Sequence, residues 1–249
     1  MDVINESASE TSESERERSI LDQFRFWETE SRKEQEKERF HQNQVRFISI
    51  SRQYGCSGFR IGEPLATALN EQRVQRLPRW AVYDKKLIDM VCHDHELERI
   101  LVESFESRKL GFLDRYLGEL RANLSDSRMT FRKCSETIFR LAGKGGVIII
   151  GRAAALITAS LLGGLHIRIV APFDWRVDQV AEYEKINSRQ EAEDYVRQMD
   201  HERGRLVKDL TGQDIVSPEN YDLVLNQKRL GIDGIIKTVL QVIEIKPTI

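Results

Sequence analysis

Residues 45–69 decide the fold of this chain, and they read VRFISISRQYGCSGFRIGEPLATAL. Apolar and small polar residues alternate over 45–51, which predicts a β-strand. A turn rich in glycine and serine follows, and the spacing after it predicts a helix over 63–71 with Pro64 in its first turn. In parallel α/β domains the order strand, small-residue turn and helix builds a cradle of backbone amides that suits a phosphate group.

The rest of the chain alternates apolar runs with helical patterns. Further strands are predicted at residues 80–84, 147–150, 165–171 and 221–226. The run 147–150 is apolar throughout, as in a strand that is buried on both faces of a parallel sheet. Apolar periodicity between 86 and 142 predicts packed helices, and a closing helix is expected from Gly231 onward. Strands that alternate with helices predict an α/β fold with a doubly wound parallel sheet.

The first 44 residues differ in composition from the remainder. They carry 12 acidic and 7 basic side chains and contain neither glycine nor proline. Such a segment cannot bury a core of its own, so we expect a charged extension over 1–44, helical or disordered, and a folded domain over 45–249. We interpret the extension as a solvated helix, and a segment that binds a protein partner is the alternative.

Charge and cysteine content narrow the class of protein. A net charge of −2 disfavours a dedicated nucleic-acid binder. No run is apolar enough to span a bilayer, and the N-terminus lacks the core of a signal peptide. Cys56, Cys92 and Cys134 form neither a CxxC pair nor an even-numbered disulfide framework. We therefore expect a cytoplasmic protein with no nucleic-acid or membrane partner.

Four segments together resemble the cytidylate kinase-like family, a branch of the P-loop nucleoside-monophosphate kinases. They are residues 48–55 with 61–62, 83–88, 150–154, and 221–226 followed by 229–232. The resemblance covers about residues 45–243 and implies a P-loop NTPase-type sheet with two additions. One is a helical acceptor-binding insert over about 85–142, and the other is an arginine-rich lid over about 176–212. The implied chemistry is transfer of the γ-phosphoryl group of ATP, with Mg²⁺, to CMP or dCMP.

The phosphate loop that this resemblance implies consists of Gly55, Cys56, Ser57 and Gly58, whose amides would hold the phosphates of ATP. A Walker A loop carries a lysine, and Gly58 stands where many P-loop kinases place it. The family commonly lacks that lysine too, but this loop also departs from the family's usual Gly-Ser-Gly-Gly-Arg-Glu run. Arg60 is a candidate for the missing cation, with a solvated helix residue as the equal alternative. A thiol in a phosphate loop is expected to have a lowered pKa.

Two residues at strand ends are assigned to the acceptor. Arg152 directly follows the run 147–150, at the edge where open α/β sheets bind ligands. Its guanidinium suits a bidentate phosphate contact. Asp84 ends the second predicted strand, where it would orient the substrate or a hydrated Mg²⁺, or else cap the next helix.

The predicted lid carries a further charged pattern. Arg197, Asp200 and Arg203 recur at helical spacing. This resembles the lid in which arginines embrace the transferring phosphates and an acid contacts the acceptor sugar, and a solvated face is the alternative. We therefore assign Arg60, Arg197 and Arg203 to catalysis, and Asp200 to the acceptor with Asp84 and Arg152. The carboxylates that flank the Gly-Arg pair in cytidylate kinases are Ile150 and Ala153 here, so no metal ligand is assigned.

The leading hypothesis is a nucleoside-monophosphate kinase-like protein that phosphorylates CMP, dCMP or a related small acceptor, with ATP and Mg²⁺ as cofactors. The alternative from a different class is a catalytically weak regulatory module that binds nucleotide and acts through residues 1–44. The unusual loop favours the alternative, and the set of arginines favours the kinase. Acceptor identity stays open because the insert offers no readable base-recognition motif.

Overall fold

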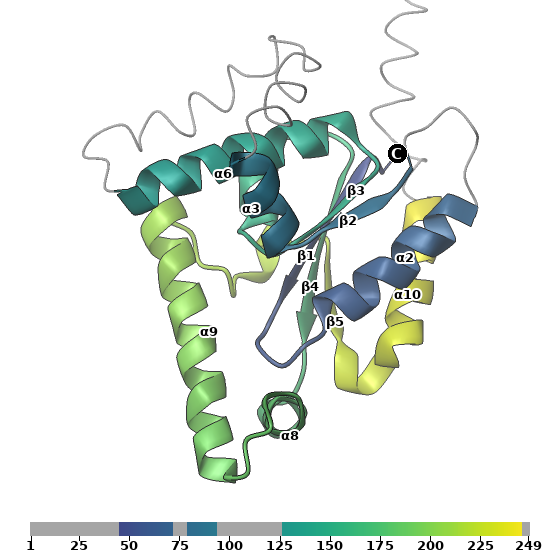
Figure 1. Ribbon diagram of the computed structural model, residues 1–249. Helices are drawn as coiled ribbons and strands as arrows, with labels where there is room; N and C mark the ends of the chain where they lie inside the picture. The colour runs from purple at the N-terminus through teal and green to yellow at the C-terminus, as the bar shows by residue number, and fades with distance from the viewer. Residues whose placement is uncertain (1–44, 72–78, 94–125, 246–249) are drawn as a thin grey trace, which may run out of the picture. The chain divides into compact units, whose positions relative to one another are not determined.

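The computed structural model describes residues 45–71, 79–93 and 126–245. The predicted extension over 1–44 and residues 94–125 of the predicted insert lie outside these ranges. The described part contains a five-stranded, all-parallel sheet with the strand order β2-β3-β1-β4-β5 (Figure 1). The strands are β1 (Phe47–Arg52), β2 (Ala81–Tyr83), β3 (Val147–Ile150), β4 (Gly164–Val170) and β5 (Leu223–Asn226).

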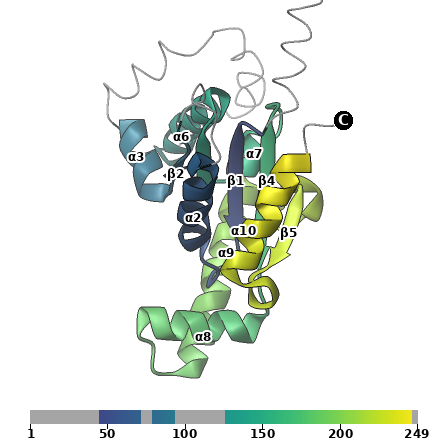
Figure 2. The same ribbon diagram turned by 90° about the vertical axis from the view of Figure 1, so that its right-hand side faces the viewer.

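Helices cover both faces of this sheet, so the predicted doubly wound α/β fold is confirmed (Figure 2). The helices of the described ranges are α2 (Gly58–Glu71), α3 (Lys85–His93), α6 (Asp126–Lys144), α7 (Ala154–Ile157), α8 (Phe173–Glu184), α9 (Arg189–Thr211) and α10 (Gln227–Ile245), with a 3-10 turn η3 (Pro218–Asn220) before β5. Helices α2 and α10 pack on one face, and α6 and α7 pack on the other. None of the helices in the described ranges is long and apolar enough to cross a membrane.

The central strand β1 contributes side chains to both cores. Phe47 packs with residues of α6 and α7, whereas Ile48 and Ile50 pack beneath α2 and α10. Each fully buried side chain of this size stabilises the fold by about 1.5–3 kcal/mol. A slip of one residue would exchange the two faces of the strand. The alternation therefore fixes the register of β1 in the sheet and, with it, the position of the carboxyl end of the strand.

The two elements that flank the turn between β1 and α2 differ in length from the sequence prediction. Helix α2 begins at Gly58 rather than at residue 63, so Pro64 lies inside the helix and not in its first turn. The reason is that the buried face already includes Ile61, one helical turn before Leu65. Strand β1 extends to Arg52. The turn between strand and helix is therefore shorter than predicted, and Arg52 belongs to the sheet.

The region predicted to be a lid forms a pair of helices, α8 and α9. Four small apolar side chains hold the two helices together, namely Val177, Val180, Ala192 and Val196. The hydroxyl of Ser188 accepts a hydrogen bond from the Glu191 amide and caps the start of α9. Gly212 ends α9 in a left-handed conformation. The helix thus has a defined start and end, which fixes the positions of the side chains along it.

Candidate functional site

A cleft of about 440 Å³ lies at the carboxyl end of β1 and β3, with further walls from α6, α7 and α9. Open α/β sheets bind their ligands at this end of the strands. The charged side chains that line the cleft are Arg52, Lys85, Arg152, Glu202 and Arg203. Four cations against one carboxylate give the lining a positive surplus, which favours an anionic ligand.

The remaining lining is divided between an apolar wall and a floor of hydroxyl groups. The apolar wall includes Phe131, Met199, Leu206, Val207, Leu210 and Ile215. On the floor, the Ser51 hydroxyl accepts hydrogen bonds from Arg168 Nη1 at 3.0 Å and from the Tyr221 hydroxyl at 3.2 Å. The cleft therefore offers apolar surface to a planar group and polar atoms to a charged one, as ligand pockets generally do.

Arg152 projects from a strained turn between β3 and α7. Gly151, Arg152 and Ala153 all have left-handed backbone angles, with φ of 80°, 55° and 56°. A residue other than glycine in this region costs about 1–3 kcal/mol, and such strain concentrates at functional sites. Arg152 Nη2 donates to both carboxylate oxygens of Asp89 on α3. Its Nε is buried and has no hydrogen-bond partner among the described residues. The turn thus holds a guanidinium in the cleft with one donor still unsatisfied.

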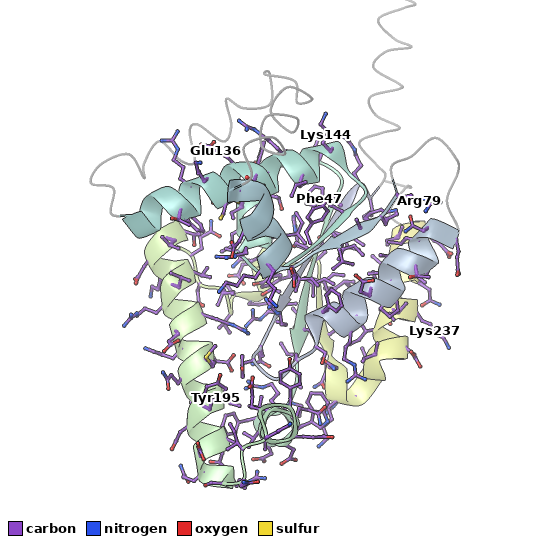
Figure 3. All side chains as sticks on the ribbon, viewed as in Figure 1. Phe47, Arg79, Glu136, Lys144, Tyr195 and Lys237 are labelled. Carbon is purple, nitrogen blue, oxygen red and sulfur yellow. The ribbon has the colours of Figure 1, made fainter. Side chains whose placement is uncertain are left out.

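Arg203 reaches the cleft from α9 and stacks on the loop between β1 and α2. This loop, residues 53–57, is called the glycine loop below. Its guanidinium carbon lies 4.8 Å from the centroid of the Tyr54 ring, a cation–π geometry. Burial lowers the pKa of Arg203. The Tyr54 ring also meets Tyr195 of α9 edge-on, with 5.5 Å between the ring centroids, and Tyr195 is labelled in Figure 3. Tyr54 thereby joins the loop to the helix that carries Arg203.

Asp200 is bound to the glycine loop. Its Oδ1 accepts from the Tyr54 amide at 2.8 Å, and its Oδ2 accepts from Arg176 Nη1 at 2.6 Å. The same Nη1 donates to the Tyr54 carbonyl at 2.9 Å. Gly55 fits beside this clamp because a Cβ there would lie 2.8 Å from the Arg176 carbonyl oxygen. The structure thus places Asp200 on the loop backbone, and it adds Arg176, which sequence reasoning did not assign to the site.

The predicted phosphate loop, Gly55 to Gly58, is also tied to the rest of the protein. The Cys56 amide donates to the Gln53 carbonyl at 3.2 Å, and the Ser57 amide donates to Gln227 Oε1 at 3.0 Å. None of the four predicted loop residues is among those that line the cleft. Burial raises the pKa of the Cys56 thiol to about 11. The prediction of a lowered thiol pKa was therefore wrong, because desolvation outweighs the nearby cations.

Arg52 is a charged residue of the cleft that the sequence analysis did not assign to the site. It ends β1, and its side chain runs along Gly58, where a Cβ would lie 3.5 Å from Arg52 Cδ and Nε. A Cβ on Gly151 would overlap Arg52 Nη1. Burial, and then the neighbouring Arg203 cation, lower the pKa of Arg52 to about 10, whereas Asp84 acts in the opposite direction. Its sequence signal was an arginine at the end of an otherwise buried strand, where a charge is costly.

Two arginines assigned to catalysis lie outside this cleft. Arg60 is exposed on α2, beside a second, open groove that is lined by Phe59, Glu63, Pro64, Ile232 and Asp233. Arg197 is exposed on α9, where it stacks over Phe173 with 4.2 Å to the ring centroid and lies 3.6 Å from Glu193 Oε2. The structure therefore brings Arg152 and Arg203 together with Arg52, and it does not bring Arg60 or Arg197 to them.

Asp84 lies at the margin of the site, directly before α3, and its carbonyl accepts from the Ile88 amide at 3.0 Å. Its negative charge acts on Arg52. Within residues 45–71, 79–93 and 126–245, no group of three or more histidine, cysteine, aspartate or glutamate side chains could hold a metal ion.

Three comparisons with known proteins bear on this site. A sequence model of one protein family, described as cytidylate kinase-like, matches residues 47–229. A curated uronate isomerase from Corynebacterium glutamicum is 29% identical over 120 residues, which are 48% of this chain and 23% of the isomerase. The chain thus spans about a quarter of the length of that relative.

The third comparison is with a crystal structure of an uncharacterized protein from Eubacterium ventriosum. It superposes with a TM-score of 0.59 at 19% identity, and the match covers 81% of this chain and 99% of the other. At this level of identity the likeness concerns the fold alone. It supports the α/β architecture and carries no information on the ligand of the cleft.

Proposed function

The chain belongs to the cytidylate kinase-like family, and from this membership and the cationic cleft we propose that it transfers the γ-phosphoryl group of ATP to a nucleoside monophosphate or a related small acceptor. CMP and dCMP are the first acceptors to test. The observation that carries the proposal is the gathering of Arg52, Arg152 and Arg203 in one cleft at the carboxyl ends of β1 and β3. The chain is a nucleotide kinase-like protein.

The arginines suit phosphoryl transfer for an electrostatic reason. The transition state spreads negative charge over the equatorial oxygens of the moving group, so catalysis consists mainly of positioning and charge stabilisation. Arg152 would hold the acceptor phosphate through its guanidinium fork. Arg203, carried by α9, would neutralise charge that develops between donor and acceptor. The apolar wall of the cleft would support the base of the acceptor.

ATP would bring Mg²⁺ with it. This ion is usually held by phosphate oxygens and waters with only one or two carboxylates, so it does not need a preformed cage of protein ligands. Among the described residues, we propose the carboxylate of Asp84, whose charge acts on Arg52 of the cleft, as its protein ligand. The ion would supply neutralising charge at the phosphates.

The glycine loop supports a second candidate function. The amides of Tyr54, Cys56 and Ser57 all donate to groups of the protein itself. A loop whose amides are engaged in this way suits a regulatory module that binds nucleotide weakly and turns it over slowly. In that reading the protein would act through residues 1–44.

The test is coupled ADP release from the full chain with ATP and Mg²⁺, with CMP, dCMP, UMP, AMP and GMP offered in turn. We expect turnover that depends on one acceptor and that Arg203→Ala lowers at least a hundredfold, in the range measured for transition-state cations. Lys208→Ala is the matched control on the same helix, because Lys208 is exposed and does not line the cleft.

Calorimetric titration of ATP interprets a negative result in that assay. ATP binding without turnover for any of the five acceptors would favour the regulatory module or a different acceptor. The absence of both binding and turnover would contradict the proposed function.

A further inference from the structure

We propose that Arg52 supplies the phosphate-contacting cation that many P-loop kinases carry as a lysine at the position of Gly58. This inference rests on the proposed function and assigns a role in it to one residue. The sequence offers Arg60 as a replacement for the lysine, but Arg60 is exposed on α2 and lines the open groove outside the cleft. Arg52 lines the cleft itself.

Arg52 lies where its charge can replace that of a lysine at residue 58. Its side chain passes beside Gly58, since a Cβ at residue 58 would lie 3.5 Å from Arg52 Cδ and Nε, in ordinary van der Waals contact. The same Cβ would lie 2.8 Å from Ile150 Cγ2, so Ile150 is the side chain that excludes a larger residue there. The guanidinium of Arg52 ends against Gly151, where any side chain would overlap Nη1. Gly151 thus makes room for the arginine, which delivers its charge from the strand rather than from the helix.

The guanidinium of Arg52 differs from those of other arginines in what it binds. Arginines with a structural role in this protein donate hydrogen bonds to protein oxygens. Arg46 donates to the Gly143 carbonyl at 3.0 Å, Arg168 donates to Ser51 at 3.0 Å, and Arg176 donates to Tyr54 and Asp200. Among the hydrogen bonds of the described residues, none comes from the Arg52 guanidinium. A partly buried guanidinium normally uses its donors, so those of Arg52 are available to a ligand in the cleft.

The charges around Arg52 also favour an anionic ligand beside it. Burial and Arg203 lower the pKa of Arg52, and the effect of Arg203 exceeds the opposing effect of Asp84. The two guanidinium groups therefore repel each other across the cleft more strongly than the nearby carboxylate compensates. An anion between them would remove this repulsion. Strongly perturbed groups in a cleft are characteristic of functional sites, and a phosphate chain with several charged oxygens is the ligand that two guanidinium groups recognise.

The experiment compares ATP affinity, measured by calorimetry with Mg²⁺, in the full chain and in Arg52→Gln, Arg52→Lys and Arg60→Gln. Loss of a charge-assisted hydrogen bond to phosphate should weaken ATP binding by about tenfold or more in Arg52→Gln. Arg60→Gln should stay within about twofold of the wild type, because a solvated surface charge contributes little. Adenosine, which has no phosphate, should bind Arg52→Gln and the wild type equally.

Thermal unfolding separates this role from a structural one. Because Arg52 is desolvated and repelled by Arg203, removal of its charge should leave the melting temperature unchanged or raise it. An arginine that held the fold together would lower the melting temperature on replacement. A melting temperature lowered in Arg52→Gln, together with equal losses of ATP and adenosine affinity, would therefore overturn the inference.

Arg52→Lys supplies a pH signature. A lysine in this place would experience the same burial and the same neighbouring Arg203, so its pKa would lie below the ordinary lysine value of about 10.4. ATP affinity of Arg52→Lys should therefore match the wild type at neutral pH and fall between about pH 8 and pH 10. The wild type should keep its affinity until close to pH 10, because the pKa of Arg52 is about 10.

The outcomes distinguish this inference from the function on which it rests. If the wild type binds ATP and Arg52→Gln binds it equally well, the inference is overturned and the proposed function stands. A loss in Arg60→Gln alone would overturn it in favour of the helix residue. If the wild type binds no ATP, the proposed function fails and the inference fails with it.

Discussion

The glycine loop after β1 and the turn after β3 lie at the same edge of the sheet, but they differ in how their polar groups are used. In the loop, the amides of Tyr54 and Ser57 are bound by side chains from α9 and α10. In the turn, Arg152 and Ala153 hold left-handed angles, and Arg152 Nε has no hydrogen-bond partner in the part of the chain that the structure describes. The loop is thus satisfied by the protein, whereas the turn retains strain and an unused donor.

This difference indicates where a ligand gains most. A phosphate at the loop would have to replace Asp200 and Gln227 at the amides that these side chains now bind. A phosphate near the turn would meet guanidinium groups that already line the cleft. Side chains at strand ends, rather than loop amides, therefore carry the proposed recognition of phosphate. The turn after β3 and the glycine loop can each be tested by substitution.

The largest effect is expected at the turn. Gly151→Ala would place a methyl group against Arg52 Nη1 at a residue with φ of 80°. Left-handed strain and displacement of Arg52 together should lower the free energy of unfolding by about 1–3 kcal/mol, and ATP affinity should fall with it. Chemical denaturation and calorimetry measure the two effects.

Gly204→Ala is the matched control for this prediction. A Cβ at Gly204 on α9 would meet nothing within 4 Å. Alanine in a helix interior should therefore leave stability unchanged or raise it by up to about 1 kcal/mol. Equal losses in Gly151→Ala and Gly204→Ala would contradict the special role of the turn.

The next effect concerns the acceptor. Arg152→Ala removes the guanidinium that is paired with Asp89 and should weaken CMP binding by about tenfold or more, in the range of a lost charge-assisted pair. ATP affinity should change by less than about threefold, because the proposed donor contact belongs to Arg52. Separate calorimetric titrations of the two nucleotides check the split, and unchanged CMP affinity in a folded variant would remove Arg152 from the acceptor site.

A smaller effect is expected when the loop is released from α9. Asp200→Ala leaves the buried Arg176 without its carboxylate and the Tyr54 amide without its acceptor. Because Asp200 is partly exposed, solvent screens the pair, and we expect a loss of about 1–2 kcal/mol. For a folded part of this size that corresponds to a fall of roughly 2–8 °C in melting temperature. A melting temperature equal to that of the wild type would show that the clamp does not hold the loop.

At neutral pH the smallest effect on stability is expected from Cys56, which reports on the loop through its reactivity at high pH. Its pKa is raised from the ordinary 9.0 to about 11, mainly by burial. The folded state therefore favours the protonated thiol, so the stability linked to this group is complete below pH 9 and is lost as the pH rises towards 11. At pH 9 the native thiolate fraction should be about fiftyfold below that of the unfolded chain. Alkylation resolved by mass spectrometry checks this, and equal rates in native and denatured protein would contradict it.

The sheet could be predicted from the sequence because each strand has a local signal. The run 147–150 is apolar throughout and appears as β3, and the alternation after residue 45 appears as β1. Hydrophobic periodicity also placed Arg152 at the ligand-binding edge, where it lies. The start of α2 was misplaced because Pro64 suggested a first turn, whereas the buried face begins already near Ile61.

The site could be predicted only in part because its contacts join distant segments. Asp200 meets the Tyr54 amide across 146 residues of sequence, and Arg176 meets the Tyr54 carbonyl across 122. No local pattern contains such pairs. Arg52 was missed for a related reason, since its importance depends on room provided by Gly151, which is far from it in the chain.

Hydrogen–deuterium exchange of the full chain with and without ATP and Mg²⁺ tests most directly whether the arginine cleft is the nucleotide site. We predict that ATP slows exchange in peptides that cover the end of β1, the turn at Gly151 and the part of α9 around Arg203. Arg52→Gln should show a smaller change at the same ATP concentration. Protection confined to the open groove beside Arg60 and Ile232, with none at the turn or on α9, would contradict the account.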